Sequence, residues 1–155
     1  MKTQDYTSTI TVNVSPQEAF EAISRITGWW VTKVEGESLA VGDVFTLPMN
    51  NTWVKLKVAE AVPGRRIVWD VVDSYLAWVE DKSEWTGTKI VWDITSDGAA
   101  TTITMTHVGL MPEVECYDVC QAGWTHHVQE SLKSLLTEGK GNPRTFDADK
   151  SVTSG

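Results

Sequence analysis

The sequence has little that would mark a disulfide-stapled or membrane-spanning protein. Two cysteines in 155 residues are too few for a disulfide scaffold. No apolar run reaches the ~20 residues that a membrane-spanning helix needs, and the first ten residues lack the apolar core of a signal peptide. We therefore expect a soluble, cytoplasmic protein that does not insert into membranes.

Positive charge is also scarce. Lys and Arg number 13 against 21 Asp and Glu, which gives a formal net charge of -8. Phosphate binding needs a concentrated basic surface, so this balance argues against nucleic acid as a partner. The excess of carboxylates is typical of a solvated acidic surface that keeps a domain in solution.

Tryptophan, in contrast, is abundant. Eight Trp residues occur in a chain whose length fits one domain with a sizeable core. Each indole buries a large apolar area and carries one N–H that needs an acceptor. So many indoles predict a large interior, a binding cavity or both.

Hydrophobic periodicity predicts the order strand, helix, several strands, long helix. Alternating apolar residues predict strands at 7–14, 43–48, 53–61, 67–72, 88–95 and 101–108. Ser15-Pro16 followed by Glu18 has the spacing of a capping box and predicts a helix directly after the first strand. A longer helix is predicted over 113–138. There, apolar residues recur at spacings of three, four and seven, namely Tyr117, Cys120, Trp124, His127 or Val128, and Leu135.

This order predicts an α+β domain. A sheet with one apolar face needs a cover, and the C-terminal helix is the only long amphipathic element available. We therefore expect a curved antiparallel sheet wrapped around that helix. Residues from Lys140 onward have few apolar side chains and are expected to fray. The domain is then assigned to 1–141 and a flexible tail to 142–155.

Several segments, taken in order, resemble the START-like (SRPBCC) superfamily and its branch named after the activator of the 90-kDa heat-shock protein ATPase. The segments are Ser15-Pro16 before Ala19-Phe20, Gly28-Trp29-Trp30, VPGRRIVWDV (62–71), EWTGT (84–88), TTITMTHVGL (101–110) and CYDVCQAGW (116–124). The match runs from about Thr7 to Gly141. The resemblance implies a helix-grip fold. It also implies that relatives bind lipids, hormones or polyketides, and that a few are cyclases or hydrolases.

A cavity between the sheet and the C-terminal helix is the predicted ligand site. Its expected lining is Trp30, Phe45, Leu56, Trp69, Val71, Trp92, Met105, His107, Tyr117, Cys120, Trp124, His127 and Val128, with Trp29, Trp78 and Trp85 near its mouth. Three indoles on facing walls are hard to pack without gaps, and the Tyr and His side chains would orient a ligand. A plain hydrophobic core is the alternative interpretation.

The cysteines and histidines raise the possibilities of zinc binding and of catalysis. Cys116, Cys120 and His127 lie near one helical face and have donor atoms that suit zinc. The CxxC spacing and ligands from a second element are missing, so we expect no metal, no cofactor and free thiols. A disulfide between cysteines four apart on a helix is also disfavoured by geometry. For His107, a buried and fully hydrogen-bonded side chain is preferred over a catalytic base.

Three functions remain open. The favoured one is non-catalytic binding of a small apolar, lipid-like or aromatic polyketide ligand by a monomer, and it predicts a real cavity. The second is a co-chaperone-type interaction module whose partner is a chaperone or another protein, and it predicts an exposed apolar patch. The third is a cyclase or hydrolase acting on an aromatic ring, and it predicts His107 or His127 beside a carboxylate.

Overall fold

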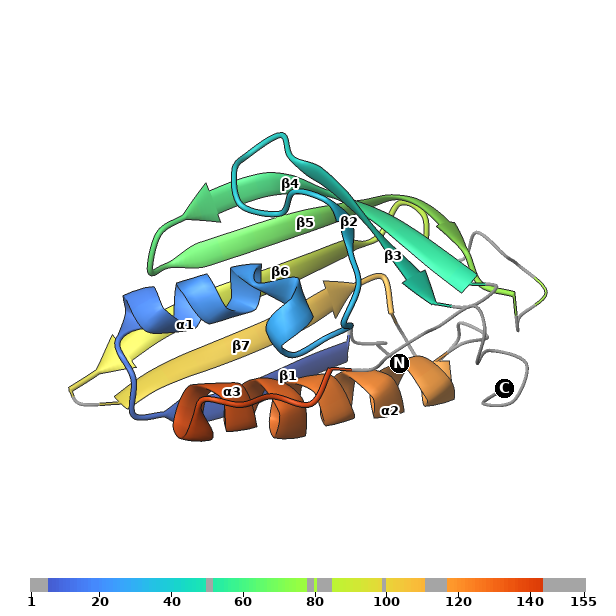
Figure 1. Cartoon of the computed structure of the whole chain (residues 1–155). Coiled ribbons are helices and arrows are strands. Elements are labelled where there is room, and N and C mark those ends of the chain that lie inside the picture. The colour runs from blue at the N-terminus through green and yellow to red at the C-terminus, as the bar shows by residue number, and fades with distance from the viewer. Residues whose placement is uncertain are drawn as a thin grey trace, which may run out of the picture.

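A curved sheet forms the body of the molecule (Figure 1). The computed structural model describes residues 6–49, 52–77, 80, 85–98, 100–110 and 117–143. Within these residues, seven antiparallel strands have the order β1-β7-β6-β5-β4-β3-β2. They are β1 (Tyr6–Val12), β2 (Glu35–Gly36), β3 (Val44–Met49), β4 (Thr52–Val62), β5 (Arg66–Tyr75), β6 (Lys89–Asp97) and β7 (Ala100–Val108). The sequence predicts all of these except β2, which is too short to show an alternation.

The curvature of the sheet has a local cause in the pairing of β4 with β5. The register shifts between Lys55 and Leu56, where Val72 of β5 is the extra residue, and again between Val58 and Glu60, where Ala59 of β4 is the extra residue. Irregularities of this kind bend a strand and increase its twist. They turn the apolar face of β3, β4 and β5 toward the face of β6 and β7, so that both enclose one interior.

The first helix begins as its sequence predicts. In α1 (Pro16–Ser24), the Ser15 hydroxyl accepts a hydrogen bond from the backbone N–H of Glu18, and the Glu18 carboxylate accepts one from the backbone N–H of Ser15, each at 3.1 Å. A 3₁₀ turn, η1 (Ile26–Gly28), follows and leads into Trp29 and Trp30. Because α1 buries Ala19, Ala22 and Ile23, it shares with the C-terminal helix the task of covering the sheet.

The C-terminal helix is not a uniform α-helix. It runs as α2 (Tyr117–Thr125), a π-helical segment η2 (His126–Leu132) and α3 (Lys133–Glu138). In the wider π turn, hydrogen bonds join residues five apart. The buried pairs are His127 with Val128 and Ser131 with Leu132. The sequence leaves His127 and Val128 as alternatives on the buried face, and the π segment buries both. Among the described residues, no helix is long and apolar enough to span a membrane.

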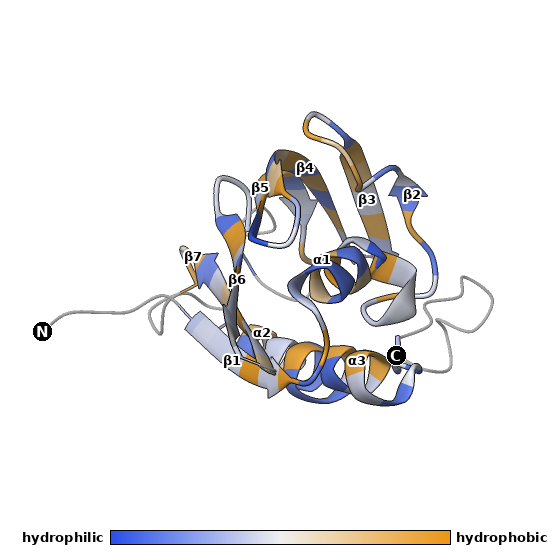
Figure 2. Cartoon of the chain, turned by 90° about the vertical axis from the view of Figure 1, so that its left-hand side faces the viewer, coloured by the Kyte–Doolittle hydropathy of each residue, from blue (hydrophilic) through white to orange (hydrophobic). Residues whose placement is uncertain are grey.

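The helix also protects the open edge of the sheet along β1 (Figure 2). The side-chain amide of Gln129 donates to the Ser8 hydroxyl at 2.6 Å and to the Thr9 carbonyl at 3.0 Å. An unpaired strand edge is a site for unwanted pairing with another chain. The C-terminal helix therefore covers both the apolar face and this edge.

The chain keeps contacts with the C-terminal helix after Gly139. The Ser134 hydroxyl donates to the Lys140 carbonyl at 2.6 Å, and the Ser131 hydroxyl accepts from the backbone N–H of Asn142 at 2.7 Å. Gly141 lies so close to the Gly28 carbonyl that any side chain there would collide with it. These contacts join Lys140 to Asn142 to the domain, and residues after 143, which make up most of the tail expected at 142–155, lie outside the described part of the chain.

Candidate functional site

Among the described residues, seven buried aromatic side chains meet in the interior between the sheet and the two helices. This aromatic cluster consists of Trp29, Trp30, Phe45, Trp69, Trp85, Trp92 and Trp124. None of the seven side chains is more than 8% exposed. They come from the segment after η1, from β3, β5 and β6, from the turn before β6 and from α2, so that segments far apart in the sequence converge on one site.

Trp30 lies at the centre of the aromatic cluster. It stacks on Trp29, with ring centroids 5.5 Å apart, and on Trp69, with centroids 6.0 Å apart. Its ring is also 4.9 Å from that of Trp124 on the helix. Trp69 and Trp92 share the concave face of β5 and β6, where their rings lie edge to face at 5.7 Å. Trp30 therefore contacts the sheet through Trp69 and the C-terminal helix through Trp124.

His107 holds one end of the aromatic cluster in a continuous chain of hydrogen bonds. The indole N–H of Trp124 donates to His107 Nδ1 at 3.0 Å. Because Nδ1 accepts, the ring carries its proton on Nε2, which donates to the Thr88 hydroxyl at 2.9 Å. The Thr88 hydroxyl in turn donates to the Trp85 carbonyl at 2.6 Å. Every polar atom of this chain has a partner.

The surroundings of His107 decide its protonation. The side chain is fully buried, and burial lowers the pKa of His107 to about 3. It is therefore neutral at pH 7, with both ring nitrogens engaged. This is the buried, satisfied histidine that the sequence favours, and it is unsuited to act as a general base.

Three indole N–H groups of the aromatic cluster donate to an acceptor, whereas two others do not. Trp29 donates to the Ile23 carbonyl at 3.2 Å, Trp85 donates to the Cys120 sulfur at 3.3 Å, and Trp124 donates to His107. The indole nitrogens of Trp69 and Trp92 are buried and have no hydrogen-bond partner among the described residues. A buried donor without an acceptor is uncommon and calls for an explanation.

The residues predicted to line the site fall into three groups. Trp30, Phe45, Trp69, Trp92 and Trp124 belong to the aromatic cluster, and His107 adjoins it. Leu56, Val71, Met105 and Val128 are buried in the surrounding core, as is Cys120 beside Trp85. His127 lies 6.3 Å from the Trp30 ring, and Tyr117 is only partly buried.

Two indoles that the sequence places near the cavity mouth lie deeper than expected. Trp29 is fully buried, and Trp85 is stacked 6.1 Å from Trp124 inside the aromatic cluster. The stretch Gly28-Trp29-Trp30 could have indicated this, since the 3₁₀ turn directs both indoles inward. Trp78 and Cys116 lie outside the described residues.

An open hollow on the surface lies elsewhere. It measures about 690 Å³ and is bounded by Pro16 at the start of α1, the β4–β5 turn and β6. Arg66 borders it, but its guanidinium is already paired with Glu60 at 3.3 Å and with Asp93 at 2.6 Å. This hollow is not the predicted apolar cavity. The described residues also contain no group of three His, Cys, Asp or Glu side chains arranged to hold a metal ion.

The fold and the buried aromatic interior define a protein of the helix-grip class. The family model described as Activator of Hsp90 ATPase homolog 1-like protein matches residues 13–137. Because this match covers well over half of the chain, the protein belongs to that family. A search of curated proteins gave no match.

Solved structures confirm the fold. The solution structure of the Aha1 dimer from Colwellia psychrerythraea has a TM-score of 0.72 at 22% identity, covering 88% of this chain and 98% of the other. CalU16 from Micromonospora echinospora has a TM-score of 0.64 at 16% identity, and the match covers 92% of this chain and 88% of CalU16. DynU16, a putative protein in the dynemicin biosynthetic locus, gives 0.63 at 18% identity, covering 87% of this chain and 48% of the other. At these identities the likeness establishes the fold alone.

Proposed function

We propose that this protein binds a small apolar, aromatic ligand between the sheet and the C-terminal helix, without transforming it. The observation that carries the proposal is the convergence of seven aromatic rings from both walls of the interior. Ligand sites are typically apolar and aromatic, with a few polar groups that fix orientation. A relative in fold that comes from a biosynthetic locus supports a role with small molecules.

The state of the nearest histidine, His107, supports binding without catalysis. Both ring nitrogens of His107 are used to hold Trp124 and Thr88, and its low pKa keeps it neutral. A base would need a free nitrogen and a pKa near the working pH. His107 therefore supports the architecture of the site.

The test is a panel of aromatic and lipid-like compounds, followed by tryptophan fluorescence and by melting temperature. A ligand of the native state at a hundred times its Kd should stabilise the fold by about 2.7 kcal/mol. N-acetyltryptophanamide serves as the control for quenching in free solution. If no compound alters either signal beyond that control, the proposal fails.

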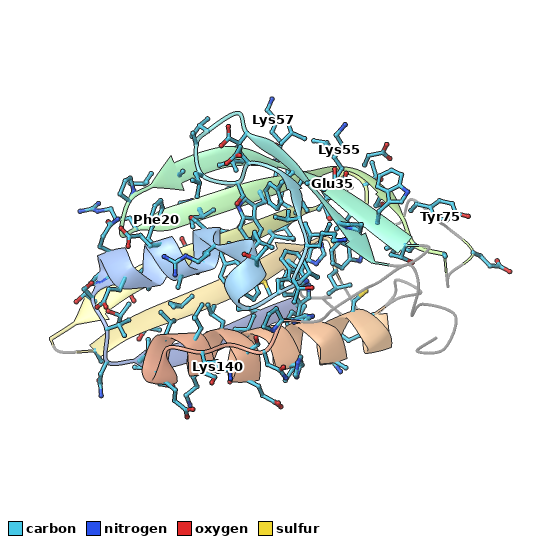
Figure 3. The ribbon with its side chains drawn as sticks, in the orientation of Figure 1. Phe20, Glu35, Lys55, Lys57, Tyr75 and Lys140 are labelled. Carbon is cyan, nitrogen blue, oxygen red and sulfur yellow. The ribbon has the colours of Figure 1, made fainter. Side chains whose placement is uncertain are left out.

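A protein-interaction module is the second candidate, and an exposed apolar loop favours it. Leu39 and Val41, between β2 and β3, are 62% and 61% exposed and form an apolar tip (Figure 2). The loop is held in shape, because the Asp43 carboxylate accepts from the backbone N–H groups of Leu39 at 3.2 Å and Ala40 at 2.9 Å. Lys55 and Lys57 project from the neighbouring strand (Figure 3).

The two candidates separate in a chaperone assay. As an interaction module, the chain should raise the ATPase rate of the 90-kDa heat-shock protein, and the double substitution L39S/V41S should abolish the increase. As a ligand-binding protein, it should leave that rate unchanged. Sedimentation at increasing concentration tests the predicted monomer, since the Colwellia relative is a dimer.

A further inference from the structure

We infer that the ligand of the aromatic cluster carries a carbonyl oxygen that accepts hydrogen bonds from the indole N–H groups of Trp69 and Trp92. This inference rests on the proposed function and adds the chemical class of the ligand, an aromatic ketone or quinone. It starts from the two buried indole nitrogens that lack a partner among the described residues. Both side chains are fully buried.

The position of the two donors suits one ligand. Trp69 on β5 and Trp92 on β6 project from neighbouring strands onto the same concave face. Their ring centroids are 5.7 Å apart, so both rings border the same part of the interior and lie within the span of one small aromatic ligand. A carbonyl oxygen has two lone pairs and can accept two hydrogen bonds.

The rings that surround these donors favour a carbonyl over an internal water. Trp69 adjoins Trp30 and Phe45, and Trp92 adjoins Trp29 and Trp124. The N–H groups of Trp29 and Trp124 already donate elsewhere, and aromatic carbon offers no strong acceptor. A water molecule would have two hydrogens of its own to place, and buried waters typically make about three hydrogen bonds. A carbonyl oxygen only accepts, and its aromatic frame would stack on the same rings.

A matched pair of probes isolates the carbonyl. 1-Tetralone and tetralin share one bicyclic carbon skeleton and differ by a ketone in place of a methylene group. We expect 1-tetralone to bind at least about tenfold more tightly than tetralin, as measured by isothermal titration calorimetry, because each hydrogen bond that the ketone accepts from a buried donor can contribute up to about that factor. Trp69→Phe and Trp92→Phe keep an aromatic ring and remove the donor, so each should lower this ratio toward one.

Trp29→Phe is the matched control. It also shrinks a fully buried indole of the aromatic cluster, but its N–H already donates to the Ile23 carbonyl. The affinity ratio of the two probes should therefore be the same as in the wild type. A similar fall of the ratio in this variant would show that ring size, and not the donors at Trp69 and Trp92, sets the preference.

A second measurement needs no variant to fold. In a ¹H–¹⁵N spectrum of the wild type, which has eight indoles, 1-tetralone should move two indole N–H signals downfield that tetralin leaves in place. If both probes bind equally and no such shift occurs, the inference is wrong while the proposed function stands. If neither probe nor any other aromatic compound binds, the proposed function fails and the inference falls with it.

Discussion

The two ends of the aromatic cluster use the same side chain in opposite ways. At the His107 end, the N–H of Trp124 begins a chain that passes through His107 and Thr88 and ends at the Trp85 carbonyl. At the sheet end, the N–H groups of Trp69 and Trp92 have no acceptor among the described residues. The hydrogen bonds of the first end are complete within the protein, whereas the second end has two buried donors that our inference assigns to a bound acceptor.

This difference assigns different tasks to the two ends. A satisfied hydrogen bond contributes about 0.5–1.5 kcal/mol to stability, whereas an unpaired buried donor costs about 1–3 kcal/mol. The His107 end therefore fixes the C-terminal helix to β7 and to the turn before β6. The Trp69 end gives up stability, which is common where a surface is kept for binding.

The largest expected effect is at the complete end, with Trp124→Ala. The indole is buried, contacts the rings of Trp30, Trp85 and Trp92, and donates to His107. Removing it should lower the free energy of unfolding by ~3–5 kcal/mol, because a large cavity opens in a packed interior. Urea denaturation measures this change.

Trp53→Ala supplies the comparison, because Trp53 lies on β4 and is only partly buried. This substitution should lower the free energy of unfolding by clearly less than Trp124→Ala does. If the Trp124→Ala protein is as stable as the wild type, the helix does not lie in the position described and the whole site loses its support.

The second expected effect is a pH dependence that His107 creates. Burial lowers the pKa of His107 from 6.5 to about 3 in the folded state. Between these two values the unfolded chain binds more protons at this site than the folded chain does, so stability rises with pH and is lost as the pH falls below 6.5. The slope from one such group is at most about 1.4 kcal/mol per pH unit.

His107→Phe removes this titratable group and replaces it with a somewhat larger aromatic ring. The variant should be less stable at pH 7, because the Trp124 N–H and the Thr88 hydroxyl lose a partner. From pH 6.5 to pH 5 it should then lose about 1.6 kcal/mol less stability than the wild type. Equal losses for both proteins in urea titrations would mean that His107 titrates in the folded state near its ordinary pKa.

Much of the fold could be predicted because it depends on local patterns. Alternation places Ile67 and Trp69 on one face of a strand, and the Ser15–Glu18 spacing sets the start of α1. The register shifts between β4 and β5 were not predictable, since no glycine or proline marks them. The same holds for the π segment, which contacts Trp30 and β1 and has no distinct spacing in the sequence.

The sequence predicts which residues belong to the site, but it does not predict their hydrogen-bond partners. Periodicity places Trp69, Trp92 and Trp124 on facing walls, and the structure brings their rings together. Which indole finds an acceptor depends on rotamers and on the relative position of two walls, and these are set by the tertiary structure. No pattern could have shown that Trp124 reaches His107 while Trp69 and Trp92 reach no described acceptor.

The smallest expected effect is the difference in stability between Trp69→Phe and Trp124→Phe in the unliganded protein. This difference compares the two ends of the aromatic cluster directly. Both changes replace a buried indole by a smaller ring, so the cavity terms are similar. Trp124→Phe also breaks a hydrogen bond and leaves His107 Nδ1 without its donor, whereas Trp69→Phe removes a donor that has no partner among the described residues. Trp69→Phe should therefore be less destabilising by about 1–2 kcal/mol, as measured by urea denaturation. Equal losses would mean that the Trp69 N–H is already satisfied in the free protein, and the two ends of the aromatic cluster would then not differ.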